Sequence, residues 1–190
     1  MSNQLILILP NLITLARIIA VPVIVWLILK DEMLIAFWLF FAAGVSDALD
    51  GFIAKRFDCQ TVIGAFLDPL ADKALLVSAY LSLGYKDIIA TWLVILVVFR
   101  DLVIIGGAMV FQAVTQSLHM DPLMISKANT LAQIILIGVL LGGLGFGLEA
   151  QTMAANQILT VVVAFTTVAS GAAYVYKWGR KASDIERDGE

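Results

Sequence analysis

Cysteine and histidine are almost absent from this 190-residue chain, which holds one of each, Cys59 and His119. A single cysteine excludes an intrachain disulfide and a cysteine-ligated metal cluster. His119 stands alone in a polar stretch, and no serine or cysteine has a plausible activating partner beside it. We therefore do not expect catalysis by a histidine-activated nucleophile.

Charge is also scarce, since 14% of the residues are charged and 61% are hydrophobic. Soluble domains usually hold about 25% charged and about 45–50% apolar residues. Several nearly uncharged stretches have about 20 residues, the length that crosses the apolar core of a bilayer. These features predict a membrane-embedded chain. The net charge of −3 and the lack of a basic patch argue against nucleic acid as a partner.

The apolar stretches predict an all-α polytopic membrane protein with one domain over residues 1–190 and no internal repeat. A short interfacial helix is expected over residues 1–10, ending at Pro10. No basic region precedes this stretch, so we expect no signal peptide and a retained first span. Six membrane spans are predicted to follow, at 11–30, 33–55, 62–84, 88–113, 123–147 and 154–177.

Basic residues between the predicted spans are distributed unequally. The loops after the first and third spans hold only Lys30 and Lys86. The loops after even-numbered spans, the adjoining start of the fifth span and the C-terminal end hold Lys55, Arg56, Lys127, Lys177, Arg180, Lys181 and Arg187. Because cytoplasmic loops carry the excess of basic residues, both termini are predicted to be cytoplasmic.

Four aspartates lie in or at the edge of predicted spans, where ionised groups are expensive. Asp47 and Asp50 are three residues apart at the cytoplasmic end of the second span, and Asp68 and Asp72 are four apart in the third. Each pair lies on one helix face, and the short loop between the spans lets the pairs converge. Four carboxylates repel one another unless cations are present, and oxygen ligands suit Mg²⁺, Mn²⁺ or Ca²⁺. Two such ions would clamp a phosphate-bearing substrate.

Small and basic residues accompany the aspartates. Gly51, Ala54 and Gly64 would let a nucleotide approach the backbone closely, and Lys55 and Arg56 could meet its phosphates. Two other interpretations stay open. The aspartates could form a structural polar seam, paired with the embedded cations Arg17, Lys73 and Arg100. They could also form a proton or cation pathway, as in a divalent cation transporter.

The spacing of these residues resembles a family signature. The run Asp47-x-x-Asp50-Gly51-x-x-Ala54-Lys55-Arg56, followed by Gly64-x-x-x-Asp68-x-x-x-Asp72, is similar to that of the CDP-alcohol phosphatidyltransferases. Lys55 replaces the usual arginine, which keeps the cation but loses bidentate geometry. Four further segments resemble the cardiolipin synthase branch of this family. They are Pro10-Asn11-x-x-Thr14-x-x-Arg17, Arg100-Asp101, Ser126-Lys127-x-Asn129-Thr130-x-x-Gln133 and Phe165-Thr166-Thr167-x-Ala169-Ser170.

The resemblance implies a metal-dependent enzyme that moves a phosphatidyl group from CDP-diacylglycerol to phosphatidylglycerol, giving cardiolipin and CMP. Two Mg²⁺ or Mn²⁺ ions would be held by Asp47, Asp50 and Asp68, with Asp72 helping and also acting as general base. The nucleotide pocket would be lined by Gly51, Ala54, Lys55, Arg56 and Gly64. A homodimer in the bacterial or mitochondrial inner membrane, with a cytoplasmic active site, is also implied.

The acceptor alcohol is less well defined by the sequence. Arg100 and Lys127 are candidates to bind its phosphate, although Arg100 could instead pair with Asp101, and Asn129 could serve only helix packing. The alternative acceptor is glycerol 3-phosphate, used by the phosphatidylglycerophosphate synthases. A dianionic acceptor should require additional cations, and residues 102–113 contain none.

Overall fold

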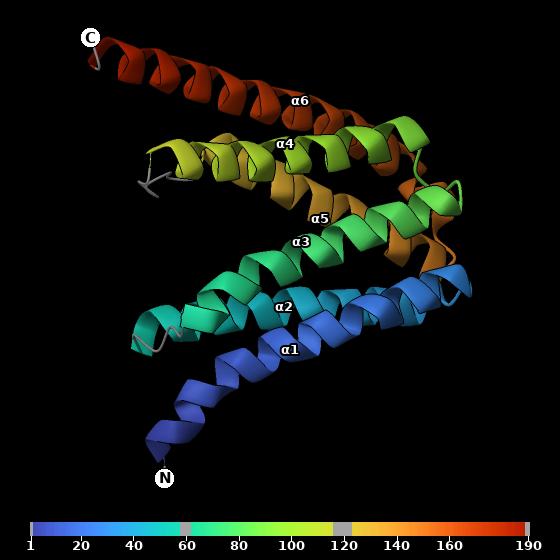
Figure 1. The fold of residues 1–190 in the computed structure, drawn as a ribbon. Coiled ribbons are helices and arrows are strands. Elements are labelled where there is room, and N and C mark those ends of the chain that lie inside the picture. The colour runs from blue at the N-terminus through green and yellow to red at the C-terminus, as the bar shows by residue number, and fades with distance from the viewer. Residues whose placement is uncertain (1, 58–61, 116–122, 189–190) are drawn as a thin grey trace. The chain divides into compact units, whose positions relative to one another are not determined.

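The computed structural model describes the backbone of residues 2–57, 62–115 and 123–188, and the side chains of 14–46, 71–107 and 123–180. The described backbone forms six α-helices and no strand (Figure 1), which confirms the all-α prediction. Each predicted span falls on one helix. The helices are α1 (Ser2–Leu29), α2 (Met33–Phe57), α3 (Val62–Tyr85), α4 (Thr91–Thr115), α5 (Met124–Gly145) and α6 (Glu149–Asp188).

The separate helix predicted for residues 1–10 is wrong, because α1 continues through Pro10 as one helix of 28 residues. Proline removes one backbone hydrogen bond and crowds the preceding turn, which bends a helix without necessarily ending it. Figure 1 shows the first, dark-blue turns of α1 angled away from the rest of the helix. A proline alone is therefore a poor marker of a helix boundary in an apolar sequence.

Helix α6 is longer than the predicted span, with 40 residues from Glu149 to Asp188. Hydropathy marks where a chain leaves apolar surroundings, whereas a helix ends where its backbone bonding ends. The polar residues after Tyr176 are compatible with a helix in water, so α6 continues past the point where the apolar stretch stops.

The chain divides into two compact units. The first, residues 1–89 and 137–153, contains α1, α2, α3 and the second part of α5. The second, residues 90–136 and 154–190, contains α4, the first part of α5 and most of α6. In the first unit α1 packs against both α2 and α3. Its core includes the fully buried side chains of Ile24, Ile28, Ala36, Tyr80 and Leu83.

Three tight turns in the first unit share one backbone motif. After α1, the Glu32 N–H donates to the Leu27 carbonyl at 2.9 Å, and the Asp31 N–H donates to the Ile28 carbonyl at 3.1 Å. This pair of bonds is the Schellman motif, with a left-handed residue just past the helix. The left-handed residue is Asp31 (φ 63°) after α1, Asp87 (φ 56°) after α3 and Gly147 (φ 68°) after α5. These turns end α1, α3 and α5 within a few residues.

Two glycines, one in α4 and one in α5, allow close helix packing. A Cβ on Gly107 of α4 would overlap the ring of Trp178 of α6, which also packs on Tyr174. A Cβ on Gly145 of α5 would lie 2.7 Å from the Cα of Leu34 in α2. Both contacts lie within a single unit.

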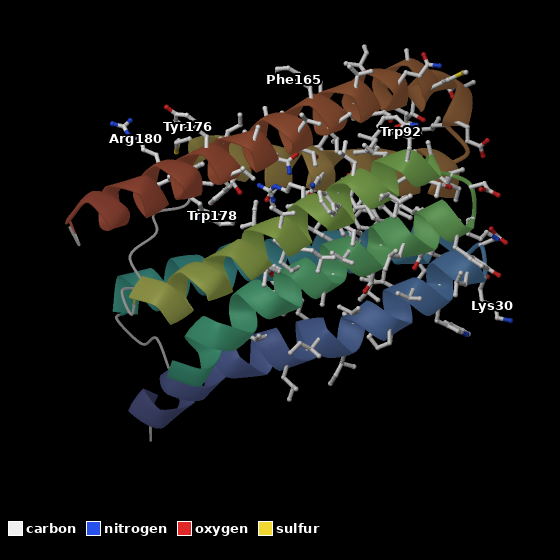
Figure 2. All side chains as sticks on the ribbon, turned by 45° about the horizontal axis from the view of Figure 1, so that its top comes forward. Lys30, Trp92, Phe165, Tyr176, Trp178 and Arg180 are labelled. Atoms are coloured by element: carbon white, nitrogen blue, oxygen red, sulfur yellow. The ribbon has the colours of Figure 1, made fainter. Side chains whose placement is uncertain are left out.

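Within the described residues, two helical segments are long and apolar enough to cross a membrane, Met124–Gly145 and Glu149–Arg180. Shorter apolar segments occur at Thr14–Leu29 and Met33–Ser46. Many large apolar side chains on these helices are exposed, among them Trp26, Ile158 and Phe165. Figure 2 shows Phe165 projecting outward from α6. The part of the chain that is described fits a membrane protein, and the six-span topology stays a prediction.

Candidate active site

The four signature aspartates lie on α2 and α3, which are helical through positions 47–50 and 68–72. Only residues 58–61 separate the two helices, so Phe57 and Val62 are at most about 18 Å apart. A rise of 1.5 Å per residue puts Asp47 and Asp50 about 21 and 26 Å from the start of α2. Asp68 and Asp72 are about 26 and 20 Å from the end of α3 by the same measure. Since the start of α2 and the end of α3 lie at the same end of the first unit, all four positions lie at a similar level.

Most of the predicted site side chains lie outside the described residues. Their backbone is helical, but the predicted contacts of these side chains with metal and nucleotide stay predictions. The residues concerned are Asp47, Asp50, Gly51, Ala54, Lys55, Arg56, Gly64 and Asp68. The described members of the predicted site are Asp72, Arg100 and Lys127.

Asp72 forms an ion pair with Arg17 across α3 and α1. The Arg17 Nη1 donates to Asp72 Oδ1 at 2.7 Å, within the range of a charge-assisted hydrogen bond. The Arg17 side chain is 1% exposed, whereas the Asp72 side chain is 40% exposed. The polar-seam interpretation is therefore correct for this one pair. The open side of Asp72 keeps it accessible to a ligand.

The partnership of Arg17 and Asp72 was not singled out from the sequence, although a signal for it exists. Arg17 lies about 18 Å along α1 from Leu29, close to the depth of about 20 Å calculated for Asp72. The Asp31–Lys86 ion pair, with Nζ and Oδ2 2.7 Å apart, joins the ends of α1 and α3 from which these depths are counted. Matching the depths of embedded charges would have paired the two residues.

Arg100 is enclosed in the second unit. Its Nη1 donates to Asp101 Oδ1 at 2.7 Å, and its Nη2 donates to the hydroxyls of Ser126 at 2.6 Å and of Ser170. Arg100 and Asp101 are each 4% exposed. These contacts match the ion-pair alternative and connect α4 with α5 and α6. The role predicted for Arg100 in acceptor binding stays a prediction.

Asn129 and Lys127 of α5 differ in exposure. Asn129 is fully buried, and its Oδ1 accepts hydrogen bonds from the hydroxyls of Thr166 at 2.8 Å and Thr167 at 2.9 Å. This interhelical bonding is the packing role considered for Asn129. Lys127 is exposed in the first turn of α5, where it is accessible to an anionic ligand.

The donor chemistry of the aspartate positions fits a hard divalent ion. Carboxylate oxygens are the ligands that Mg²⁺ and Mn²⁺ prefer, and the backbone positions of the four aspartates lie at a similar level on α2 and α3. Among the residues with described side chains, no cluster of three or more histidine, cysteine, aspartate or glutamate residues occurs. Asp72 is the one signature aspartate within that set, so the metal prediction is untested.

A family model matches residues 7–169, and its description is CDP-alcohol phosphatidyltransferase. The chain belongs to the CDP-alcohol phosphatidyltransferase family. This confirms the resemblance found in the sequence. The match covers α2 and α3 completely and includes Arg17, Arg100 and Asn129, so both ion-paired arginines lie within the family domain.

Named members of the family resemble the chain to similar degrees. It is 37% identical to rice CDP-diacylglycerol–glycerol-3-phosphate 3-phosphatidyltransferase 1, chloroplastic, covering 90% of this chain and 56% of the relative. It is 35% identical to human cardiolipin synthase (CMP-forming), covering 94% of this chain and 64% of the relative. It is 34% identical to CDP-diacylglycerol–glycerol-3-phosphate 3-phosphatidyltransferase of Bacillus subtilis, covering 89% of this chain and 94% of the relative. The chain thus spans less than two thirds of the rice and human proteins.

Proposed function

We propose that this chain is a membrane-embedded phosphatidyltransferase that joins CDP-diacylglycerol to phosphatidylglycerol, giving cardiolipin and CMP. The observation that carries the proposal is the common level of the four signature aspartates on α2 and α3. A chain of this family with four aspartate positions at one depth is suited to a substrate that carries a diphosphate.

Six membrane spans are part of the proposal. Helices α1 to α5 contain 22 to 28 residues each, and about 20 residues suffice to cross the apolar core of a bilayer. The aspartates lie about 20–26 Å from the turn end of the first unit, beyond the midplane of a core about 30 Å thick. The excess of basic residues on that side favours a cytoplasmic active site.

Size-exclusion chromatography with light scattering tests the predicted homodimer.

The reaction assigns distinct roles to this chain's residues. Asp72 takes the proton from the acceptor hydroxyl, and the alcohol oxygen forms a bond to the phosphorus that bears diacylglycerol. The bond from that phosphorus to the bridging oxygen of the diphosphate breaks, and CMP leaves with the electron pair. Gly51, Ala54 and Gly64 would leave room for the nucleotide, and Lys55 and Arg56 would bind its phosphates.

The metal ions have a defined place in this proposal. Asp47, Asp50 and Asp68 would hold two Mg²⁺ or Mn²⁺ ions with help from Asp72. When bound, the ions would offset negative charge on the diphosphate.

The state of Arg100 supports a lipid acceptor over glycerol 3-phosphate. Its guanidinium is buried and bonded to Asp101, Ser126 and Ser170, so it offers little to an incoming dianion. A phosphodiester such as phosphatidylglycerol carries one negative charge and needs fewer cations. The second candidate is glycerol 3-phosphate, because the rice and Bacillus subtilis relatives are named for it and the Bacillus protein is of similar length.

Turnover of the purified chain tests the function directly. CMP release is measured with CDP-diacylglycerol and Mg²⁺ or Mn²⁺, with phosphatidylglycerol and glycerol 3-phosphate supplied separately. Cardiolipin formation supports the first candidate, whereas release with glycerol 3-phosphate alone supports the second. Metal binding without CMP release from any acceptor would contradict the enzyme proposal and favour cation transport.

A further inference from the structure

Arg17 is placed to control the orientation of the Asp72 carboxylate. Its guanidinium lies within the packed first unit, with 1% of the side chain exposed, and its Nη1 contacts Asp72 Oδ1 at 2.7 Å. Thr14, one turn earlier on α1, is also 1% exposed. Surrounding side chains therefore restrict Arg17, whereas 40% of the Asp72 side chain is open.

A carboxylate with this exposure has rotational freedom unless a contact fixes it. Its terminal torsion is broad, so packing on one side alone does not define which oxygen faces a ligand. A short charge-assisted bond to a rigid guanidinium selects one orientation. Because catalysis depends on near-attack geometry, a fixed carboxylate favours proton transfer from a bound alcohol.

We propose that Arg17 is a positioning residue, which holds Asp72 by Oδ1 and thereby orients the carboxylate toward the acceptor hydroxyl. The inference rests on the proposed role of Asp72 as base. Arg17 acts from α1, outside the signature on α2 and α3, and makes the first helix a working part of the site.

Direct binding of the acceptor phosphate by Arg17 is a different possibility with a different kinetic consequence. A cation that binds the acceptor lowers its KM, so its removal raises that KM. A positioning residue changes kcat and leaves both KM values near those of the wild type. The burial of Arg17 and its bond to Asp72 favour positioning.

The test compares Arg17→Met and Arg17→Lys with two controls in the full-length chain. Lys86→Met removes a cation from an ion pair of the same 2.7 Å length at the turn end of the first unit. Ile24→Ala weakens the core of α1 without changing an ionic contact. For each protein, kcat is expressed per CDP-binding site, counted by calorimetric titration with CDP and Mn²⁺. This normalisation removes the effect of misfolded protein.

We expect Arg17→Met to lower kcat per site by about 10–100-fold with both KM values within about twofold of the wild type. Arg17→Lys keeps a cation with shorter reach and should recover part of the rate. Both controls should retain wild-type kcat per site. If Arg17→Met does not fold, a reduced kcat per site in Arg17→Lys supports positioning, and a wild-type value overturns it.

Three outcomes would overturn the proposal. They are an unchanged kcat per site in Arg17→Met, an increase confined to the acceptor KM, or an equal loss in Ile24→Ala. Absence of CMP release from the wild-type protein would instead defeat the proposed function. The two failures are therefore distinguishable.

Discussion

The Arg17–Asp72 and Arg100–Asp101 pairs have the same N–O distance of 2.7 Å, yet their surroundings differ. Both arginine side chains are buried, at 1% and 4% exposure. The Asp72 side chain is 40% exposed, whereas that of Asp101 is 5% exposed. The open carboxylate of Asp72 can contact a ligand, whereas the Arg100–Asp101 pair is surrounded by its protein neighbours. Exposure, and not bond length, separates the candidate chemistry from the scaffold.

The two pairs also differ in where their residues lie along the chain. Arg100 and Asp101 are consecutive on α4, and hydroxyls from α5 and α6 complete the ligation of the guanidinium. Arg17 and Asp72 are 55 positions apart and come from α1 and α3. The first pair belongs to an internal polar network. The second joins two helices at the depth of the signature aspartates.

The largest effect is expected from Asp72→Asn, which removes the proposed base. Turnover should fall by about 10²–10⁴-fold, while CDP-lipid binding stays within a few fold of the wild type, because the amide oxygen can still accept from Arg17. CMP release and CDP-lipid titration measure the two quantities. Asp31→Asn, in the exposed ion pair, is the matched control. A parallel loss of binding and turnover would contradict the base assignment.

The enclosed pair should affect stability more than any other contact described. Arg100→Met leaves the Asp101 carboxylate buried and should lower the free energy of unfolding by about 3–5 kcal/mol. Adding Asp101→Leu removes that charge and should recover most of the loss. Denaturant unfolding in detergent micelles measures both variants. Equal destabilisation in the single and double variants would show that Arg100 matters through its serine contacts instead.

The helices were predictable because long apolar stretches have few alternatives to helical structure. Interruptions such as Lys30-Asp31-Glu32 marked the turns within a few residues. The helix end predicted at Pro10 was wrong because a proline was treated as the end of backbone bonding. The left-handed residues Asp31 and Asp87 were also not foreseen, since aspartate carries a weaker turn signal than glycine.

The sequence was enough to predict which residues belong to the candidate site, but not which contacts they make. The spacing of Asp47, Asp50, Asp68 and Asp72 gave the family, which the comparison confirmed. Hydrogen bonding between distant helices depends on packing angles that spacing does not contain. For that reason the serine ligands of Arg100 emerged only from the structure.

A smaller effect on stability is expected from the uncharged hydrogen bonds of buried Asn129. Asn129→Leu removes the acceptor shared by Thr166 and Thr167 between α5 and α6, and should destabilise by about 0.6–1.7 kcal/mol. Thr130→Val is the control, because the Thr130 hydroxyl donates to the Ser126 carbonyl within its own helix. Thermal unfolding in micelles compares the two. A larger loss in Thr130→Val would contradict the interhelical role of Asn129.

The smallest effect is expected at the exposed pair, Lys86–Asp31, whose side chains are 25% and 67% exposed. Lys86→Met should destabilise by less than about 1 kcal/mol, and high salt should reduce the difference further. Asp31→Asn should behave similarly, because asparagine tolerates the left-handed backbone of Asp31, at φ 63°. Asp31→Val should lower the free energy of unfolding by about 1–2 kcal/mol more than Asp31→Asn does. This extra loss should be the same at any salt concentration, because it comes from the strain of a branched side chain on a left-handed backbone. If the extra loss in Asp31→Val, relative to Asp31→Asn, became smaller as the salt concentration rose, that loss could not come from the left-handed backbone of Asp31.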